Sequence, residues 1–376
     1  MIYHVSDAII NPLGFDTETV FQAVLNGHTA IRRVSLPEGN TFMLGKMTEQ
    51  DYTVLDGMVP GADYSRFEQL CIAAVQQALS ATDILLTDSE TVLLLSTTKG
   101  NIEWINDPER KALVSIPAAA QRIADYFQHP NPVITVSVAC ISGAAAQITA
   151  KRLLDAGRYK HAVIVGCDVI SDFVLAGFNS FQALSDEQCR PFDAERKGLN
   201  LGEAAVCMVL SSEASHSSQT AILSGGSISN DANHLSGPSK TGAELGLAIS
   251  QSLAEAQLQP QEVGFISAHG TATNYNDEME AKAIGHAGLS AVPVHSLKPY
   301  FGHTLGASGL LESIIGLKAL QQNTLIPVPG FRESNTSVPL HVITSISQQP
   351  VAHFVKTAAG FGGCNAALVW SKTVNQ

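Results

Sequence analysis

Three residues of the kinds used in nucleophilic catalysis stand directly after apolar, strand-like runs of this 376-residue chain. Cys140 follows the β-branched run 133–138, and the segment after it is rich in small residues and typical of a helix. A cysteine on a strand-to-helix turn lies at the positive end of the helix dipole, so we expect its surroundings to favour the thiolate. His269 and His303 each follow a further apolar run. A single cysteine with distant histidines is the arrangement of a thiol enzyme whose site assembles on folding.

Each of these residues also has an ordinary structural interpretation. Free cysteine is usually an inert, buried, small hydrophobic residue, and a single histidine after a strand more often completes a core than catalyses. Neither histidine segment has the spacing of metal ligands, so we expect no metal site there. The same strand-then-turn context recurs three times, and this recurrence favours a shared site.

The hydrophobic pattern predicts the elements that must position these residues. We expect strands over 1–10, 91–96, 133–138, 162–165, 204–210, 263–266 and 292–296. Helices are expected over 16–26, 65–79, 116–127, 277–285 and 307–320, and after Cys140 as far as 154. Residues 35–62 and 168–200 show no clear periodicity and are expected to be irregular or loop. Alternating strands and helices predict an α/β protein with mostly parallel sheets.

The second half of the chain repeats the element order of the first. In both halves a strand, a helix and a second strand lead to a turn, and a helix rich in small residues follows. Cys140 and His303 occupy corresponding turns of these two units, so we expect the two small-residue helices to lie together between two layers. The polar stretch 211–219 is the best linker candidate between halves that span 1–210 and 220–376.

Five motifs, taken in chain order, resemble those of the β-ketoacyl-[acyl-carrier-protein] synthases of the thiolase superfamily. They are residues 139–143, residues 190–193 with Gly202 and Glu203, residues 269–273, residues 298–303, and residues 360–363 with Asn365. The resemblance covers nearly the whole chain. It implies a thiolase-like fold, in which two similar halves form a layered αβαβα sandwich.

The resemblance also implies a catalytic set. Cys140 would carry the acyl chain, and His269 and His303 would donate hydrogen bonds to the malonyl thioester oxygen. Lys298 and Glu312 would form the supporting pair that orients the histidines. The alternative for this pair is an ordinary charge pair at the surface or at a helix start.

Further residues match the substrate-binding parts of the family's site. The backbone N–H groups of Cys140 and Phe361 would form the oxyanion hole, and the Phe361 side chain would gate the acyl pocket. Thr271 and Thr273 would hydrogen-bond the pantetheine arm, although ordinary turn chemistry also explains them. The loop around Phe361 would be supported by Gly360, Gly362, Gly363 and Asn365.

The implied activity is that of a stand-alone condensing enzyme. An acyl chain moves to Cys140, and decarboxylation of malonyl-carrier gives a carbanion that extends the chain by two carbons. The pathway would be fatty-acid synthesis or a specialised polyene or polyketide synthesis. One alternative is a non-catalytic partner subunit resembling a chain length factor, against which the retained Cys140, His269 and His303 argue. A CoA-dependent thiolase, with Cys364 as a second cysteine, is less favoured because the two-histidine pattern is intact.

The implied partner is an acyl carrier protein, whose phosphopantetheine holds the substrates, so we expect no separate cofactor. A homodimer is expected, with a heterodimer of two related chains as the alternative. Carrier proteins are acidic, yet residues 51–63 contain no lysine or arginine and leave Arg66 alone before the helix at 65–79. We therefore expect weaker docking, another docking face or a specialised carrier. Basic residues that could compensate are Lys151, Arg152, Arg190, Arg196 and Lys197.

Composition narrows the class of protein. Hydrophobic residues make up 45% of the chain and charged residues 15%, which is typical of a compact globular protein. The net charge of −12 argues against non-specific binding to nucleic acid. Six cysteines without a C-x-x-C pair fit a reducing compartment. The N-terminus lacks the features of a signal peptide and the apolar runs are too short to span a membrane, so we expect a cytoplasmic protein.

Overall fold

The computed structural model describes residues 1–35, 40–61, 63–216 and 221–373. Within these residues, one eleven-stranded sheet has the order β13-β11-β10-β15-β16-β9-β1-β8-β6-β4-β5. Its first half consists of β1 (Tyr3–Ile10), β4 (Thr91–Ser96), β5 (Ile134–Val136), β6 (His161–Asp168) and β8 (Ala204–Ser211). Its second half consists of β9 (Ala221–Asn230), β10 (Phe265–Ser267), β11 (Pro293–His295), β13 (His341–Val342), β15 (His353–Gly360) and β16 (Cys364–Lys372).

The two halves of the sheet have the same internal order. Strands β1-β8-β6-β4-β5 correspond to β9-β16-β15-β10-β11, and β1 and β9 join the halves through the pair Tyr3 and Ile222. The outer strands β6, β4 and β5 run parallel, as do β15, β10 and β11. The strands beside the junction run antiparallel. The expectation of parallel sheets therefore holds for the outer part of each half, and the sheet as a whole is mixed.

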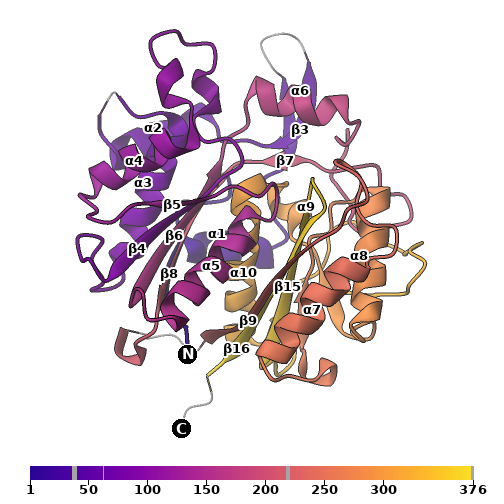
Figure 1. The fold of residues 1–376 in the computed structure, drawn as a ribbon. Helices are drawn as coiled ribbons and strands as arrows, with labels where there is room; N and C mark the ends of the chain where they lie inside the picture. The colour runs from indigo at the N-terminus through magenta and orange to yellow at the C-terminus, as the bar shows by residue number, and fades with distance from the viewer. Residues whose placement is uncertain (36–39, 62, 217–220, 374–376) are drawn as a thin grey trace.

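The helices form three layers around the two halves of the sheet (Figure 1). α3 (Arg66–Leu79) and α4 (Ile116–Tyr126) pack on the first half, and α7 (Ala243–Glu255) packs on the second half beside α8 (Asn274–His286). Between the halves lie α5 (Ser142–Asp155) and α10 (Ser308–Gln322), which contact each other and strands of both halves. α1 (Thr17–Leu25) joins this central layer by packing on β1 and α10. The predicted layered sandwich is confirmed.

Small residues allow the two central helices to approach closely. A Cβ atom on Gly143 would lie 2.9 Å from the carbonyl oxygen of Gly306, and one on Gly309 would lie 2.4 Å from the backbone nitrogen of Ala144. Both distances are shorter than real side chains tolerate. The close crossing brings the N-terminus of α5, next to Cys140, beside the turn that carries His303.

Two segments differ from the sequence-based expectation. Residues 35–62 contain β3 (Thr41–Gly45) and α2 (Glu49–Met58), and residues 168–200 contain α6 (Asp172–Ser180). The capping box of Thr48 with Asp51 begins α2, which buries only Leu55, so it lacks the apolar periodicity that reveals a helix. In the second half, β9, α7, β13, β15 and β16 have no counterpart among the predicted elements. The linker candidate 211–219 begins at the end of β8 and includes the short 3₁₀ turn Ala214–His216, and its residues 217–219 lie outside the described part.

Short elements complete the fold. β2 (Arg32–Ser35), β3 and β7 (Leu201–Gly202) form a small sheet, and β12 (Thr324–Leu325) pairs with β14 (Ser347–Gln348). α9 (Lys298–Phe301) is a single buried turn just before His303. Among the described residues, none of the helices has both the length and the apolarity that crossing a bilayer requires.

Candidate active site

Cys140 lies on a sharp turn between β5 and α5 and lines a cavity of about 560 Å³. The preceding Ala139 has a φ of +44°, in the left-handed region, which costs a residue with a side chain roughly 1–2 kcal/mol. Such a turn directs one side chain out of the sheet, as in nucleophile elbows. His269 and His303 line the same cavity, so the structure brings the three predicted residues together.

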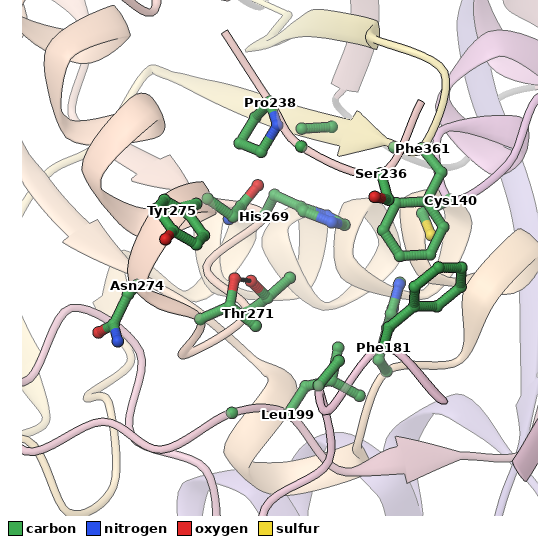
Figure 2. Close-up of a pocket in the computed structure, with 18 of the residues that line it drawn as sticks. Cys140, Phe181, Leu199, Ser236, Pro238, His269, Thr271, Asn274, Tyr275 and Phe361 are labelled. Atoms are coloured by element: carbon green, nitrogen blue, oxygen red, sulfur yellow. Dashed lines mark hydrogen bonds between the residues drawn. The ribbon is translucent and has the colours of Figure 1, made fainter. Parts of the chain in front are cut away.

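The two histidine rings lie edge to face, with centroids 5.2 Å apart and planes at 84°. Nδ1 of His303 lies 3.0 Å from the hydroxyl of Ser308 at the start of α10. When this hydroxyl donates to Nδ1, Nε2 of His303 carries the ring proton. His269 points across the cavity toward Cys140 (Figure 2).

Burial determines the charge state of all three residues. It lowers the pKa of His269 and His303 well below the usual value, and the positive charge of Lys298 lowers both further. Both rings are therefore neutral near pH 7. Burial raises the pKa of the Cys140 thiol to about 11, and the charges of Lys298 and Lys99 oppose this only in part. The expectation that the helix N-terminus favours the thiolate is thus wrong for the unliganded chain, because desolvation of the sulfur outweighs the positive charges.

A buried carboxylate bracketed by two lysines lies behind the histidines. Nζ of Lys298 is 2.7 Å from Oε1 of Glu312, and Nζ of Lys356 is 2.7 Å from Oε2. The side chains are 0%, 4% and 0% exposed for Lys298, Glu312 and Lys356, which excludes a surface charge pair. Burial raises the pKa of Glu312, but the two lysines outweigh burial and hold it below its usual value. Sequence reasoning missed Lys356, although a lysine within an otherwise apolar strand is an available signal.

The glycine-rich loop between β15 and β16 closes over Cys140. A Cβ atom on Gly360 would lie 3.0 Å from the backbone nitrogen of Cys140, and one on Gly363 would lie 2.2 Å from the carbonyl oxygen of Asp231. Gly362 and Gly363 have φ values of +84° and +74°, and the Asn365 side chain donates to the carbonyl of Gly363 at 3.0 Å. A side chain at Gly360 or Gly363 would therefore collide with neighbouring backbone, and the Asn365 bond ties the loop to itself. The predicted loop residues Gly360, Gly362, Gly363 and Asn365 thus lie together beside Cys140.

Phe361, at the tip of this loop, faces the cavity with its backbone and its ring. Its backbone N–H group partly opposes the rise that burial causes in the pKa of the Cys140 thiol. The ring packs against Phe178 and Phe181 at centroid distances of 5.9 and 5.2 Å, and it remains 37% exposed. Figure 2 shows Phe181 and Phe361 side by side next to Cys140. Sequence reasoning missed Phe178 and Phe181 because they belong to the unpredicted α6 and the residue after it.

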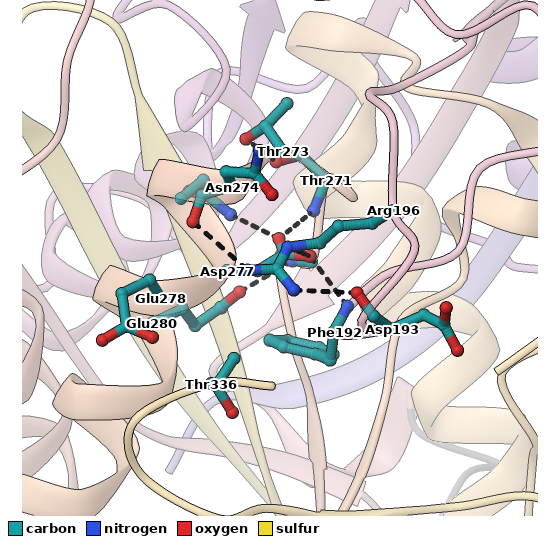
Figure 3. Close-up of polar contacts among 12 residues, drawn as sticks. Phe192, Asp193, Arg196, Thr271, Thr273, Asn274, Asp277, Glu278, Glu280 and Thr336 are labelled. Atoms are coloured by element: carbon teal, nitrogen blue, oxygen red, sulfur yellow. Dashed lines mark hydrogen bonds and ion pairs between the residues drawn. The ribbon is translucent and has the colours of Figure 1, made fainter. Parts of the chain in front are cut away.

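Thr271 and Thr273 line the cavity on the side of His269, and their hydroxyls lie 2.8 Å apart. Two carboxylates hold the turn that carries them (Figure 3). Glu280 accepts from the N–H groups of His269 and Gly270, each at 2.7 Å, and Asp277 accepts from that of Thr271 at 2.9 Å. The threonine hydroxyls remain at the cavity wall.

Two models of one protein family match most of the chain. A model described as the β-ketoacyl synthase N-terminal domain matches residues 5–216, and the corresponding C-terminal domain matches residues 220–332. The chain belongs to the β-ketoacyl synthase family. These are ketosynthase-type condensing enzymes of fatty-acid and polyketide synthesis. The resemblance drawn from the five sequence motifs is confirmed.

Individual relatives and structures agree with this assignment. Nodulation protein E of Rhizobium leguminosarum bv. trifolii is 33% identical over 67% of this chain and 65% of that protein. The 3-oxoacyl-[acyl-carrier-protein] synthase 2 of Vibrio harveyi is 26% identical over 97% of this chain and 96% of that protein. The ishigamide ketosynthase/chain length factor superposes with a TM-score of 0.89 at 25% identity, over 100% of this chain and 99% of that chain. The ketosynthase ApeO in complex with its chain length factor ApeC, from Xenorhabdus doucetiae, superposes with a TM-score of 0.84. Its sequence identity is 26%, over 99% of this chain and 98% of that chain.

Most basic residues considered for carrier docking in this β-ketoacyl synthase family member already have acidic partners. Arg66 forms an ion pair with Asp56, and Arg196 is buried 3.8 Å from Asp277. Lys151 and Arg190 pair with nearby carboxylates. Lys197 also pairs with a carboxylate, that of Glu187 at 3.5 Å, but it is 58% exposed and lines the cavity that holds Cys140.

Within the described part of the chain, one group of side chains of the types that bind metals lies outside the cavity. Ligand atoms of His161, Glu213 and His216 fall within 4.8 Å of one another. Nδ1 of His216 lies 2.8 Å from Asp83, and Lys160 lies 3.6 Å from Glu213. These side chains form an ion-pair network at the edge of the first half of the sheet.

Proposed function

We propose that this protein is a catalytic β-ketoacyl-[acyl-carrier-protein] synthase. The observation that carries the proposal is the shared cavity of Cys140, His269 and His303, in which one nucleophile faces two neutral imidazoles. Neither half of the chain holds this set alone. The cavity also has an aromatic side at Phe361 and a hydroxyl-lined side at Thr271, which suit an acyl chain and a pantetheine arm.

Acyl transfer is the first half of the proposed reaction. The Cys140 sulfur attacks the thioester carbonyl of an acyl-carrier, its proton passes to the departing pantetheine sulfur, and an acyl-enzyme and the carrier thiol result. The N–H groups of Cys140 and Phe361 stabilise the tetrahedral oxyanion. Loss of one such donor typically costs about 3 kcal/mol of transition-state stabilisation.

Condensation is the second half. Malonyl-carrier loses CO₂, and the electron pair of the broken carbon–carbon bond forms an enolate whose oxygen accepts hydrogen bonds from His269 and His303. The enolate carbon attacks the acyl-enzyme carbonyl, and the Cys140 sulfur leaves to give a β-ketoacyl-carrier two carbons longer. Neutral imidazoles suit this step because each offers an N–H donor. An imidazolium would instead readily protonate the carbanion. Beyond the carrier's phosphopantetheine, the reaction draws on no cofactor.

The proposed partners are an acyl carrier protein and a second ketosynthase-like chain. Two structures similar to this chain are described as a ketosynthase with its chain length factor. This likeness supports a heterodimer as well as a homodimer. It also supports a second candidate function, a chain-length-factor-like subunit without catalysis of its own, against which the complete Cys140, His269 and His303 set argues.

Incubation with malonyl-carrier and acyl-carrier separates these functions. A catalytic synthase releases CO₂ and gains the acyl mass on Cys140, as measured by trapping of CO₂ and by mass spectrometry of the intact protein. A thiolase would form the acyl-enzyme without releasing CO₂. A protein that shows neither reaction, alone and with a candidate partner chain, would contradict the proposal.

A further inference from the structure

Lys356 is a buried cation that the proposed chemistry has not yet used. It lies on β15, four residues before Gly360 and the loop that closes over Cys140. Its Nζ pairs with Oε2 of Glu312 at 2.7 Å and donates to the carbonyl oxygen of Ser267, two residues before His269, at 3.2 Å. Its side chain therefore connects β15, β10 and α10 behind the two histidines.

Stability alone does not explain a second lysine at this position. Glu312 already has Lys298 at 2.7 Å on its other oxygen. Removing a further cation from water is costly, and well-packed apolar residues often serve as well as a buried ion pair. Lys356 stands in a strand whose side chains from Phe354 to Ala359 are all buried, where an apolar residue would be the ordinary choice.

The second lysine balances the charges behind the histidines. Lys298 and Lys356 face the carboxylate of Glu312. A second carboxylate, Glu280, also faces this region and accepts from the N–H groups of His269 and Gly270 and from the hydroxyl of Thr357. Without Lys356, the carboxylates beside the two rings would outnumber the lysines.

We propose that Lys356 is a positioning residue that fixes the second oxygen of Glu312 and supplies the positive charge that keeps His269 and His303 neutral beside two carboxylates. The inference rests on the proposed function, because neutral rings are what enolate stabilisation requires. A fixed cation behind the rings also favours the negative charge that develops on the enolate oxygen.

The electrostatics of the neighbouring groups agree with this role. After burial and Lys298, the charge of Lys356 is a further cause of the lowered pKa of His303, and it contributes in the same direction at His269. Burial and then Lys356 lower the pKa of His295, on the neighbouring strand β11, to about 3. The charged groups that face the two histidines from α8, α9, α10 and β15 are Glu280, Lys298, Glu312 and Lys356.

The first test is the pH profile of CO₂ release from malonyl-carrier by Lys356→Met. Removing this positive charge raises the pKa of both histidines, so the acid limb of the profile moves to higher pH. The expected shift is roughly one pH unit, the order of magnitude for one nearby charge at an effective dielectric constant of ~20. Lys318→Met is the matched control, since it removes a lysine of α10 that pairs with Glu18, away from the histidines, and its profile stays in place.

Two further variants separate charge from packing. Glu312→Gln removes one negative charge and moves the acid limb to lower pH, whereas Glu312→Gln with Lys356→Met restores the parent net charge and returns the limb toward the parent position. A comparison of these two variants gives the effect of Lys356 on the acid limb even if Lys356→Met alone does not fold. An unchanged limb in every variant, with only the melting temperature lowered, would overturn the proposal and leave Lys356 a structural residue.

A direct titration makes the test independent of activity. The C–H resonances of His269 and His303, assigned by single substitution, report the protonation of each ring by NMR. Parent protein without CO₂ release, in which both histidines titrate at lower pH than in Lys356→Met, would count against the proposed function while supporting the role of Lys356. Histidines that titrate near pH 6.5 in the parent protein would refute the role of Lys356.

Discussion

At the scale of single residues, the resting state of Cys140 differs from that of a pre-ionised catalytic cysteine. Burial beside a closing loop raises its pKa to about 11, so the sulfur carries its proton until substrate arrives. Its reactivity then depends on the donor N–H group of Phe361 and on a carbonyl placed next to the sulfur, rather than on a standing thiolate.

This state predicts the pH dependence of Cys140 alkylation. The rate with iodoacetamide should rise about tenfold per pH unit from pH 7 to pH 10, because the thiolate fraction rises in that proportion below the pKa. Mass spectrometry of the peptide that contains Cys140 measures the rate. Far-UV circular dichroism of the intact protein at each pH checks that the fold is retained. A plateau reached below pH 8 would show that the helix N-terminus dominates after all.

Replacement of His303 separates the two halves of the reaction. His303→Ala should lower CO₂ release by about 10²–10³-fold, the usual loss for one donor to a developing oxyanion, while acyl loading of Cys140 continues. Stopped-flow CO₂ detection and intact-protein mass spectrometry follow the two steps. Equal loss of loading and decarboxylation would instead assign His303 to activation of the sulfur.

At the scale of elements, the crossing of α5 and α10 determines whether the site exists. Gly309→Ala would place a methyl group 2.4 Å from the backbone of Ala144 and should lower the free energy of unfolding by about 2–3 kcal/mol. Gly57→Ala is the control: a Cβ on Gly57, in the exposed helix α2, meets nothing within 4 Å, so helix propensity should raise stability by about 0.5–1 kcal/mol. Urea unfolding measures both. A Gly309 variant as stable as the parent would mean that the helices can separate without cost.

Elements with one clear apolar face or a fully buried run could be predicted from sequence. β4, buried at every position, and α3, with its Ser65 cap, are examples. α2 buries a single leucine and α6 is apolar around most of its surface, so neither shows the helical period, and both were missed. Because α6 was not predicted, Phe178 at the cavity wall was not identified from the sequence.

The motifs of the candidate site were predictable and their electrostatics were not. Cys140, His269 and His303 stand out by type and position in the chain. The pKa of a thiol depends instead on how completely the folded protein excludes water from it, and the pairing of Lys356 with Glu312 depends on contacts between residues 44 positions apart in sequence. Such quantities follow from packing, which a local pattern does not contain.

At the scale of the whole molecule, two similar halves each contribute part of one site. Cys140 comes from the turn after β5, and His303 comes from the corresponding region after β11. Joining the halves through β1 and β9 places the two small-residue helices back to back, and the reactive groups meet at their adjacent ends. Phe178 and Phe361, which lie far apart in sequence, close the cavity between the halves.

The exposed charges of the assembled molecule predict where a carrier docks. Lys197→Glu should raise KM for carrier-bound substrates by about tenfold, because Lys197 lies at the cavity and stays 58% exposed beside Glu187, where it can meet an acidic partner. Arg66→Glu should have a smaller effect, since Arg66 is 35% exposed and does not line the cavity. Loading of Cys140 from small acyl thioesters is the control for both variants. A loss of elongation larger in the Arg66 variant than in the Lys197 variant would place docking before α3.

The measurement that tests the account most directly is the mass of the product formed from acyl-carrier and ¹³C-labelled malonyl-carrier. The account predicts a β-ketoacyl-carrier lengthened by the two labelled carbons, and no such product from Cys140→Ala or from parent protein alkylated at Cys140. Carbon–carbon bond formation that survives the loss of that sulfur would contradict it.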